Sequence, residues 1–145
     1  MKRILTLLMI ATCLTSCSVF KNKQQNMEQQ ESQTVFGVEW KLKQIGNKVM
    51  KYDEERETIT LLMTSEPENV SGFSACNRYF GKFIYRKGVL TFKDIASTAM
   101  MCPNQTMELE RRYLTQLEKV NNFHITEDGE LHLRKDEKVL LVFVQ

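Results

Sequence analysis

The sequence lacks the short motifs that mark the common enzyme classes. It contains no Gly-rich phosphate-binding loop, no Gly-x-Ser-x-Gly nucleophile turn and no His-Glu-x-x-His zinc motif. Histidine is scarce, with only His124 and His132 in 145 residues. The carboxylates fall in expected loops and on the surface of one expected helix, without a convincing titratable partner. We therefore expect neither a catalytic centre nor a cofactor.

The sequence also lacks an apolar run long enough to cross a membrane, which needs about 20 residues. The apolar segment 4–14 is shorter, follows a basic start and ends in Leu-Thr-Ser-Cys at residues 14–17. This arrangement resembles the lipobox of bacterial lipoproteins. We expect residues 1–16 to be a cleaved secretory leader and Cys17 to be the lipid-carrying residue. The alternative is an ordinary signal peptide that happens to contain a cysteine.

Apolar residues are few in residues 17–33, which are rich in Gln, Asn, Lys, Glu and Ser. Such a segment buries too little surface to offset its ordering entropy, so we expect a flexible tether that reaches on the order of 50 Å. No acidic cluster follows Cys17 in residues 18–21. We therefore expect the lipid to anchor the chain to the outer membrane, on its periplasmic face. A single domain then occupies residues 34–145.

An excess of either charge is absent once the leader is removed. The full chain has 20 Lys and Arg against 18 Asp and Glu, and loss of Lys2 and Arg3 leaves 18 of each. We therefore expect no nucleic-acid partner. The expected contacts are the membrane, through the lipid, and an envelope protein or cell-wall partner, with the chain itself a monomer.

Short apolar runs separated by Gly, Asn and Asp predict a mainly β domain. The expected strands are residues 38–45, 58–64, 71–76, 81–86, 89–94, 123–127, 130–135 and 139–144. The last of these is apolar at every position, so we expect both of its faces to be covered.

Two hairpin registers follow from the apolar faces. A three-residue loop at 127–129 pairs Ile125 with Leu131, leaves Gly129 free for a left-handed conformation and makes His124 and His132 cross-strand neighbours. A two-residue loop at 87–88 instead gathers four apolar side chains on one face: Phe83, Tyr85, Leu90 and Phe92.

Helical periodicity is convincing in only one segment, after Pro103, with Asn104 or Thr106 as the expected cap. The apolar stripe contains Met107, Leu109, Tyr113, Leu114, Leu117 and Val120. The residues outside it are Glu108, Glu110, Arg111, Arg112 and Lys119. We expect this helix to cover one mouth or side of a curved sheet.

Residues 71–81 (SGFSACNRYFG), 95–103 (IASTAMMCP) and 40–42 (WKL) closely resemble the META domain family of HslJ-type bacterial envelope lipoproteins. A helix that carries Glu110 and Leu117 and a closing hairpin also match that family. The resemblance covers the whole expected domain and implies a small antiparallel β-barrel or strongly curved sheet with a single covering helix. It implies links to envelope stress and antibiotic tolerance, without an established catalytic reaction. The chain departs from the family at Ala75, where Gly is usual, and at Ala99 and Met100, where Arg is common.

Cys76 and Cys102 are the two cysteines that remain after processing and acylation. In an exported protein they are best explained as a disulfide, which would contribute roughly 3.5 kcal/mol for a loop of about 25 residues. Two free buried thiols are the alternative. A catalytic thiol would need a histidine within reach, which the sequence does not show.

Asn77, Arg78 and Tyr79 follow the first of these cysteines and form a candidate recognition loop at the rim of the sheet. The structural alternative, which we favour, is that Asn77 satisfies backbone groups of the loop while Tyr79 and Phe80 pack.

The two histidines lack a third ligand at a metal-binding spacing, so we expect surface histidines and no metal site. Four methionines suggest either a soft-metal or redox-sensing set or ordinary gap filling in the core, which is the common use of methionine: Met63, Met100, Met101 and Met107. We expect the core.

Three functions remain open. The first is a non-enzymatic envelope lipoprotein that acts through a protein or cell-wall contact, with inhibition of a wall-degrading enzyme as its most specific form. The second is a carrier of a small apolar ligand inside the barrel. The third is an enzyme of unrecognised type. Large side chains expected to point inward favour a packed interior over a carrier cavity: Trp40, Phe83, Tyr85, Leu90, Phe92 and Phe143.

Overall fold

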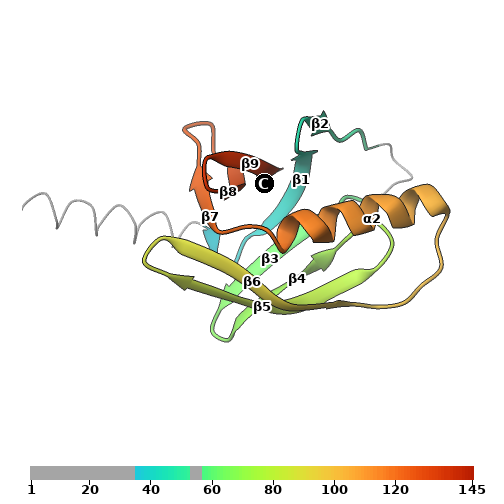
Figure 1. Ribbon diagram of the computed structural model, residues 1–145, viewed down its shortest axis with the longest axis horizontal. Helices are drawn as coiled ribbons and strands as arrows, with labels where there is room; N and C mark the ends of the chain where they lie inside the picture. The colour runs from blue at the N-terminus through green and yellow to red at the C-terminus, as the bar shows by residue number, and fades with distance from the viewer. Residues whose placement is uncertain (1–34, 53–56) are drawn as a thin grey trace, which may run out of the picture.

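The computed structural model describes residues 35–52 and 57–145. The expected leader (1–16), Cys17 and the expected tether (17–33) lie outside the described residues. In chain order the elements are β1 (Glu39–Ile45), β2 (Lys48–Val49), β3 (Thr60–Ser65), β4 (Glu68–Phe73), β5 (Arg78–Arg86), β6 (Val89–Ser97), α2 (Asn104–Leu117), β7 (Asn122–Ile125), β8 (Leu131–Lys135) and β9 (Lys138–Val144) (Figure 1).

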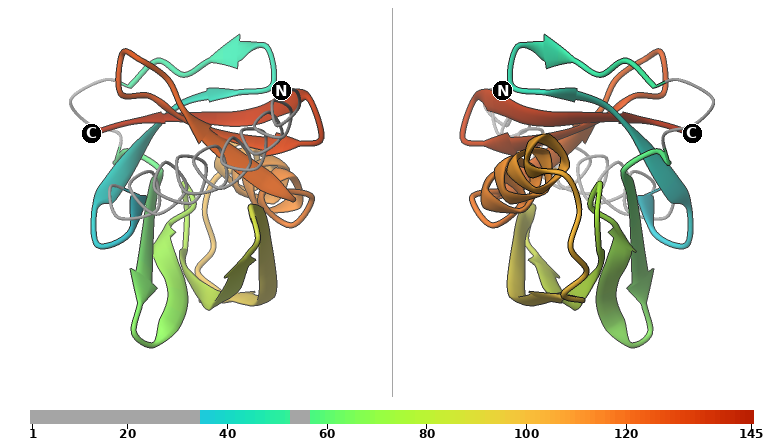
Figure 2. Two further views of the ribbon diagram at one scale, coloured as in Figure 1. Left: turned by 90° about the vertical axis from the view of Figure 1, so that its left-hand side faces the viewer. Right: turned by 90° about the vertical axis from the view of Figure 1, so that its right-hand side faces the viewer.

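The strands form one antiparallel sheet in the spatial order β6-β5-β4-β3-β1-β9-β8-β7, with β2 paired to β1. The sheet curls strongly (Figure 2), so that its end strands β6 and β7 approach each other. The Leu90 amide donates to the Asn121 carbonyl at 3.0 Å, but the two strands form no ladder among the described residues. The predicted mainly β fold is confirmed, as a strongly curved open sheet and not as a closed barrel.

Helix α2 lies between the two ends of the curled sheet and packs on β9 (Figure 2). Its side chains Tyr113 and Leu117 are fully buried. The prediction that Asn104 or Thr106 caps the helix is wrong. Pro103 is the N-cap residue, no side chain caps the helix, and the Pro103 carbonyl accepts from the Thr106 amide at 2.9 Å. The proline ring restricts φ and supplies the turn into the helix without a side-chain hydrogen bond.

Large side chains fill the space inside the curled sheet. Trp40 is buried, as expected, and its indole N–H donates to the Val35 carbonyl at 3.1 Å. The largest fully buried side chains are Trp40, Tyr79, Tyr113, Phe83, Phe143, Leu42, Ile45, Ile59, Leu61, Met63, Leu90 and Leu117. Strand β9 has four consecutive buried residues from Leu140 to Phe143, which confirms that both of its faces are covered.

Both predicted hairpin registers are confirmed. Ile125 pairs with Leu131 across the β7–β8 hairpin, and Gly129 has a φ of +77°. Phe83 pairs with Phe92 in the β5–β6 hairpin. The turn between β5 and β6 has positive φ at both Lys87 and Gly88, as a two-residue hairpin turn requires.

Several predicted strand boundaries are wrong around residues 71–81. Strand β4 begins earlier than predicted and ends at Phe73, and β5 begins at Arg78, before Gly81. The chain turns between them, where the Ser74 amide donates to the Asn77 carbonyl at 2.8 Å. Strand β6 also continues to Ser97, past a register shift. Side-chain hydrogen bonds and a bulge, which leave no periodic signal in the sequence, set these boundaries.

Candidate functional site

A disulfide joins Cys76, in the loop between β4 and β5, to Cys102, just before α2. The two Cα atoms are 6.0 Å apart. Cys76 is buried and Cys102 is half-buried. The predicted bridge is therefore present, and it holds the β4–β5 loop against the segment that leads into the helix.

The carboxylate of Glu110 joins the same loop to helix α2. It accepts hydrogen bonds from the Ser74 hydroxyl at 2.6 Å, the Asn77 amide at 2.7 Å, the Asn77 side chain at 2.9 Å and the Cys76 amide at 3.3 Å. Partial burial raises the pKa of Glu110, but these hydrogen bonds together lower that pKa below its usual value. The group is therefore held as an anion that organises the loop.

The sequence pattern placed Glu110 outside the apolar stripe, and that prediction is wrong. Glu110, Tyr113 and Leu117 follow a spacing of three and then four residues, which places them on one face of α2. The family resemblance pointed to Glu110 on this helix, and the spacing was the signal that could have placed it on the inner face. The role of Glu110 as an anchor for the loop could not be read from the sequence, because its hydrogen-bond partners lie more than 30 residues away in the chain.

Asn77 is almost completely buried and links three segments. Its side-chain nitrogen donates to Glu110, while its side-chain oxygen accepts from the Thr98 hydroxyl at 2.9 Å and the Met100 amide at 2.8 Å. All of its polar atoms thus serve the interior of the fold. This is the role that the structural alternative assigns to Asn77. Its expectation that Phe80 packs is wrong, because Phe80 lies on the outer face of β5 and is exposed.

Tyr79 is also buried, and its hydroxyl contacts that of Tyr113 at 2.8 Å and donates to the Thr60 carbonyl at 3.0 Å. Burial raises the pKa values of both tyrosines. Arg78, in contrast, is exposed and lies 3.8 Å from the Glu57 carboxylate. Of the three residues in the candidate recognition loop, only Arg78 is on the surface.

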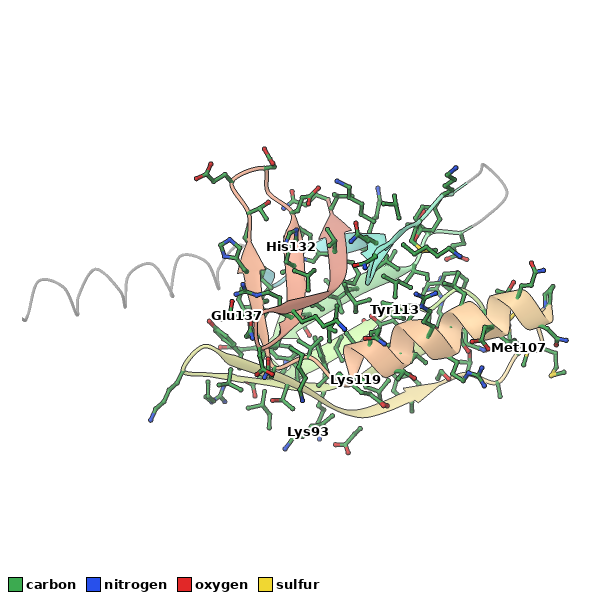
Figure 3. All side chains as sticks on the ribbon, turned by 45° about the horizontal axis from the view of Figure 1, so that its top comes forward. Lys93, Met107, Tyr113, Lys119, His132 and Glu137 are labelled. Atoms are coloured by element: carbon green, nitrogen blue, oxygen red, sulfur yellow. A yellow bond between two sulfur atoms is a disulfide. The ribbon has the colours of Figure 1, made fainter. Side chains whose placement is uncertain are left out.

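A groove of about 570 Å³ lies beside α2, along the segment fixed by the disulfide and Glu110. It is lined by Asn77, Met100, Asn104, Met107, Glu108, Glu110, Arg111, Leu114, Thr115 and Glu118. Figure 3 labels Met107 on the surface of α2. The groove combines apolar walls with carboxylates on the helix.

The prediction that the methionines fill the core is correct for Met63 alone. Met63 is fully buried, whereas Met100, Met101 and Met107 are 58%, 89% and 38% exposed. The disulfide and the hydrogen bond from the Met100 amide to Asn77 hold this segment outside the sheet. The sequence carried no signal for that displacement.

His124 and His132 are cross-strand neighbours, as predicted. His132 lies 3.2 Å from the Glu130 carboxylate, which also pairs with Lys43. Hydrogen bonds from Lys43 and His132 lower the pKa of Glu130. In the described part of the chain, no three His, Cys, Asp or Glu side chains gather as a metal site would require. Within these residues, moreover, no helix has the length and apolar character needed to cross a membrane.

Two comparisons place this architecture among known proteins. An NMR structure of a protein from Burkholderia xenovorans matches with a TM-score of 0.63 and 24% identity, over 79% of this chain and 85% of that one. A second NMR structure matches with a TM-score of 0.59 and 26% identity, over 77% of this chain and 91% of that one. A comparison with curated proteins gives no significant match. The model of the META domain matches residues 33–145, and the chain therefore belongs to the META domain family.

Proposed function

We propose that this chain is a lipid-anchored, non-catalytic envelope protein that acts by holding a protein partner in the groove beside α2. The observation that carries the proposal is the exposure of Met100 and Met107 in the lining of the groove, next to the still more exposed Met101 in the chain. Glu110 and the disulfide fix the wall of this groove. Exposed apolar side chains grouped in this way are typical of interaction sites. Methionine suits such a site because its flexible side chain adapts to a partner.

The groove also indicates the chemistry of the partner. Its helical wall carries Glu108, Glu110 and Glu118 against one cation, Arg111. Glu110 is committed to the loop, and Glu108 pairs with Arg111, so Glu118 gives the rim its acidic bias. We expect the partner to present an apolar segment next to basic residues. An envelope enzyme that degrades the cell wall is the specific form we favour.

The carrier hypothesis requires space inside the curled sheet. In the described part of the chain that space holds Trp40, Tyr79, Tyr113, Phe83 and Phe143, all fully buried. A ligand of drug size needs a pocket of several hundred Å³. The volume available at the groove is on the surface of the domain, which favours a partner segment over an enclosed ligand.

Site-specific photo-crosslinking in cells tests the proposal. A photoreactive residue at Met101 should join a discrete envelope protein, whereas the same residue at Val49, which is also exposed, should not. Met100→Glu should abolish the Met101 product and lower antibiotic or envelope-stress tolerance together. An equal product at both positions, or tolerance that is unchanged in Met100→Glu, would contradict the proposed contact.

Membrane anchoring is tested separately. Cys17→Ala should leave the chain unprocessed or release it from the membrane, because the expected thioether to lipid cannot form. A Cys17→Ala product with the mature mass that remains in the membrane fraction would contradict the anchor.

A further inference from the structure

The outer face of β5 and β6 combines cations with exposed apolar side chains. Strand β5 alternates exposed and less exposed residues along its length, as expected for a strand with one face on the core. Its outward residues are Arg78, Phe80, Lys82, Ile84 and Arg86. On β6, Val89 and Lys93 also face outward. This set of seven residues is called the basic face below.

Charge on this part of the chain is one-sided. Residues 69–93 contain five Lys and Arg and no Asp or Glu, although the expected mature chain has no net charge. Arg78 approaches Glu57, which precedes β3, and Arg86 pairs with Glu68 at the start of β4. Asp94 is exposed next to Lys93 on β6, but neither Lys82 nor Lys93 forms an ion pair with a described carboxylate, so the two cations in the middle of the basic face are unpaired.

Lys82 and Lys93 are direct partners in the β5–β6 ladder. Like charges placed opposite each other in a sheet repel. Lys135 and Lys138 are also direct partners, but the turn between them carries Asp136 and Glu137, whereas none of residues 83–92 is acidic. An external anion would relieve the repulsion between Lys82 and Lys93.

Three of the seven exposed large apolar side chains of the described residues lie on the same face: Phe80, Ile84 and Val89. Phe80 and Ile84 alternate with the cations along β5, over about 26 Å, and Val89 lies beside them at the start of β6. Figure 3 shows Lys93 on the outer side of the β5–β6 ribbon, directed away from helix α2. A surface that presents cations and apolar side chains together matches an anionic lipid layer, which offers headgroup charge above an apolar interior.

We propose that the basic face docks the domain on the surface of an anionic lipid membrane. The inference rests on the proposed membrane anchoring, because a lipid on Cys17 would keep the domain within tens of Å of a bilayer. Lys82 and Lys93 meet the lipid phosphates, while Phe80 and Ile84 enter the boundary between headgroups and acyl chains. Docking fixes the orientation of the domain, and with it the direction in which the groove beside α2 opens.

Tryptophan fluorescence of the full, membrane-purified protein in vesicles tests this orientation. The native Trp40 is buried and gives the same background in every variant. Phe80→Trp and Val49→Trp place a second indole at two positions of matched exposure, 57% and 56%. With brominated phosphatidylglycerol in the vesicles, the Phe80→Trp signal should be quenched at least threefold more than the Val49→Trp signal. In vesicles of brominated phosphatidylcholine alone, the difference should disappear.

Charge reversal supplies the second arm. Each cation near an anionic surface raises the binding constant about fivefold. Lys82→Glu/Lys93→Glu should therefore lower the ratio of docked to undocked domain at least 25-fold. Lys135→Glu/Lys138→Glu changes the charge equally at another cross-strand lysine pair. This control should dock as the wild type does. Equal losses in the two double variants would overturn the assignment of the face.

Flotation of the vesicles separates this inference from the anchoring on which it rests. An anchored protein remains with zwitterionic vesicles whether or not the basic face docks, so equal quenching at positions 80 and 49 overturns the docking alone. If the protein dissociates from zwitterionic vesicles, the lipid anchor is contradicted. In that case, docking is supported if the protein binds anionic vesicles from solution and contradicted if it does not. If the basic face binds a single-stranded oligonucleotide but does not bind anionic vesicles, it is a general polyanion site, and the proposed membrane docking is overturned.

Discussion

Asn77 and Glu110 lie 33 residues apart in the chain and are joined by two hydrogen bonds, from the Asn77 side chain at 2.9 Å and the Asn77 amide at 2.7 Å. The same carboxylate accepts from Ser74 and Cys76. Hydrogen bonds to a charged acceptor are roughly twice as strong as neutral ones. One anion on α2 therefore determines where the β4–β5 loop and its disulfide sit.

Glu110→Gln should lower the free energy of unfolding by about 2 kcal/mol. Glutamine keeps one acceptor oxygen but presents an NH₂ group to donors that already point at residue 110. Denaturant unfolding with the disulfide intact measures the loss. Glu108→Gln is the matched control, because Glu108 is exposed and pairs with Arg111 on the surface of the helix. If the two variants unfold at the same denaturant concentration, Glu110 does not hold the loop.

The lowered pKa of Glu110 predicts a loss of stability in acid. Because the folded state favours the ionised carboxylate, it binds fewer protons than the unfolded chain, and its advantage is fully present above the usual carboxyl pKa of 4.5. This contribution to the free energy of unfolding is lost as the pH falls from 4.5 through the lower pKa of Glu110 in the folded state. Unfolding free energies measured between pH 6 and pH 3 should therefore fall more steeply for the wild type than for Glu110→Gln. Parallel curves would contradict the assignment.

Ala75→Gly should raise the free energy of unfolding by about 1 kcal/mol. Ala75 has a φ of +101°, which costs on the order of 1–3 kcal/mol for a residue with a Cβ. Glycine adopts this conformation freely but loses about 0.5–1 kcal/mol of chain entropy on folding. Ala96→Gly is the control, since Ala96 is exposed in β6 without a positive φ, and it should be destabilising. An Ala75→Gly variant as unstable as Ala96→Gly would show that the strain is absent.

The elements that the sequence predicted well are those whose cause is local. The β5–β6 and β7–β8 registers follow from period-two apolar patterns and a turn of fixed length, so a window of a dozen residues contains the information. The helix after Pro103 was found in the same way, from the spacing of Tyr113 and Leu117. The family resemblance rested on residues 71–81 and 95–103, and it correctly implied the strongly curved sheet.

The candidate site was harder to predict because long-range hydrogen bonds build it. The sequence offered a structural role for Asn77 but not its partners, which are Glu110, Thr98 and the Met100 amide. The usual rule that methionine fills cores failed for Met100 and Met101, because the bridge from Cys102 to Cys76 holds their segment at the surface. In each case the decisive partner is more than 20 residues away.

Removal of the bridge by Cys76→Ala/Cys102→Ala should lower the free energy of unfolding by roughly 3.5 kcal/mol, the chain-entropy value for a loop of this length. The bridged residues are 26 apart and enclose both β5 and β6. These two strands remain paired through their own ladder, so circular dichroism below the transition should keep the native β signal. Reduced wild-type protein is the control, since it releases the loop but keeps both sulfur atoms in place. The double variant loses the packing of the sulfur atoms in addition to the bridge, but of the two cysteines only Cys76 is deeply buried. The reduced protein should therefore lose nearly as much stability as the double variant. If reduction leaves the unfolding midpoint unchanged, the bridge contributes nothing to the fold, and Glu110 alone positions the groove beside α2.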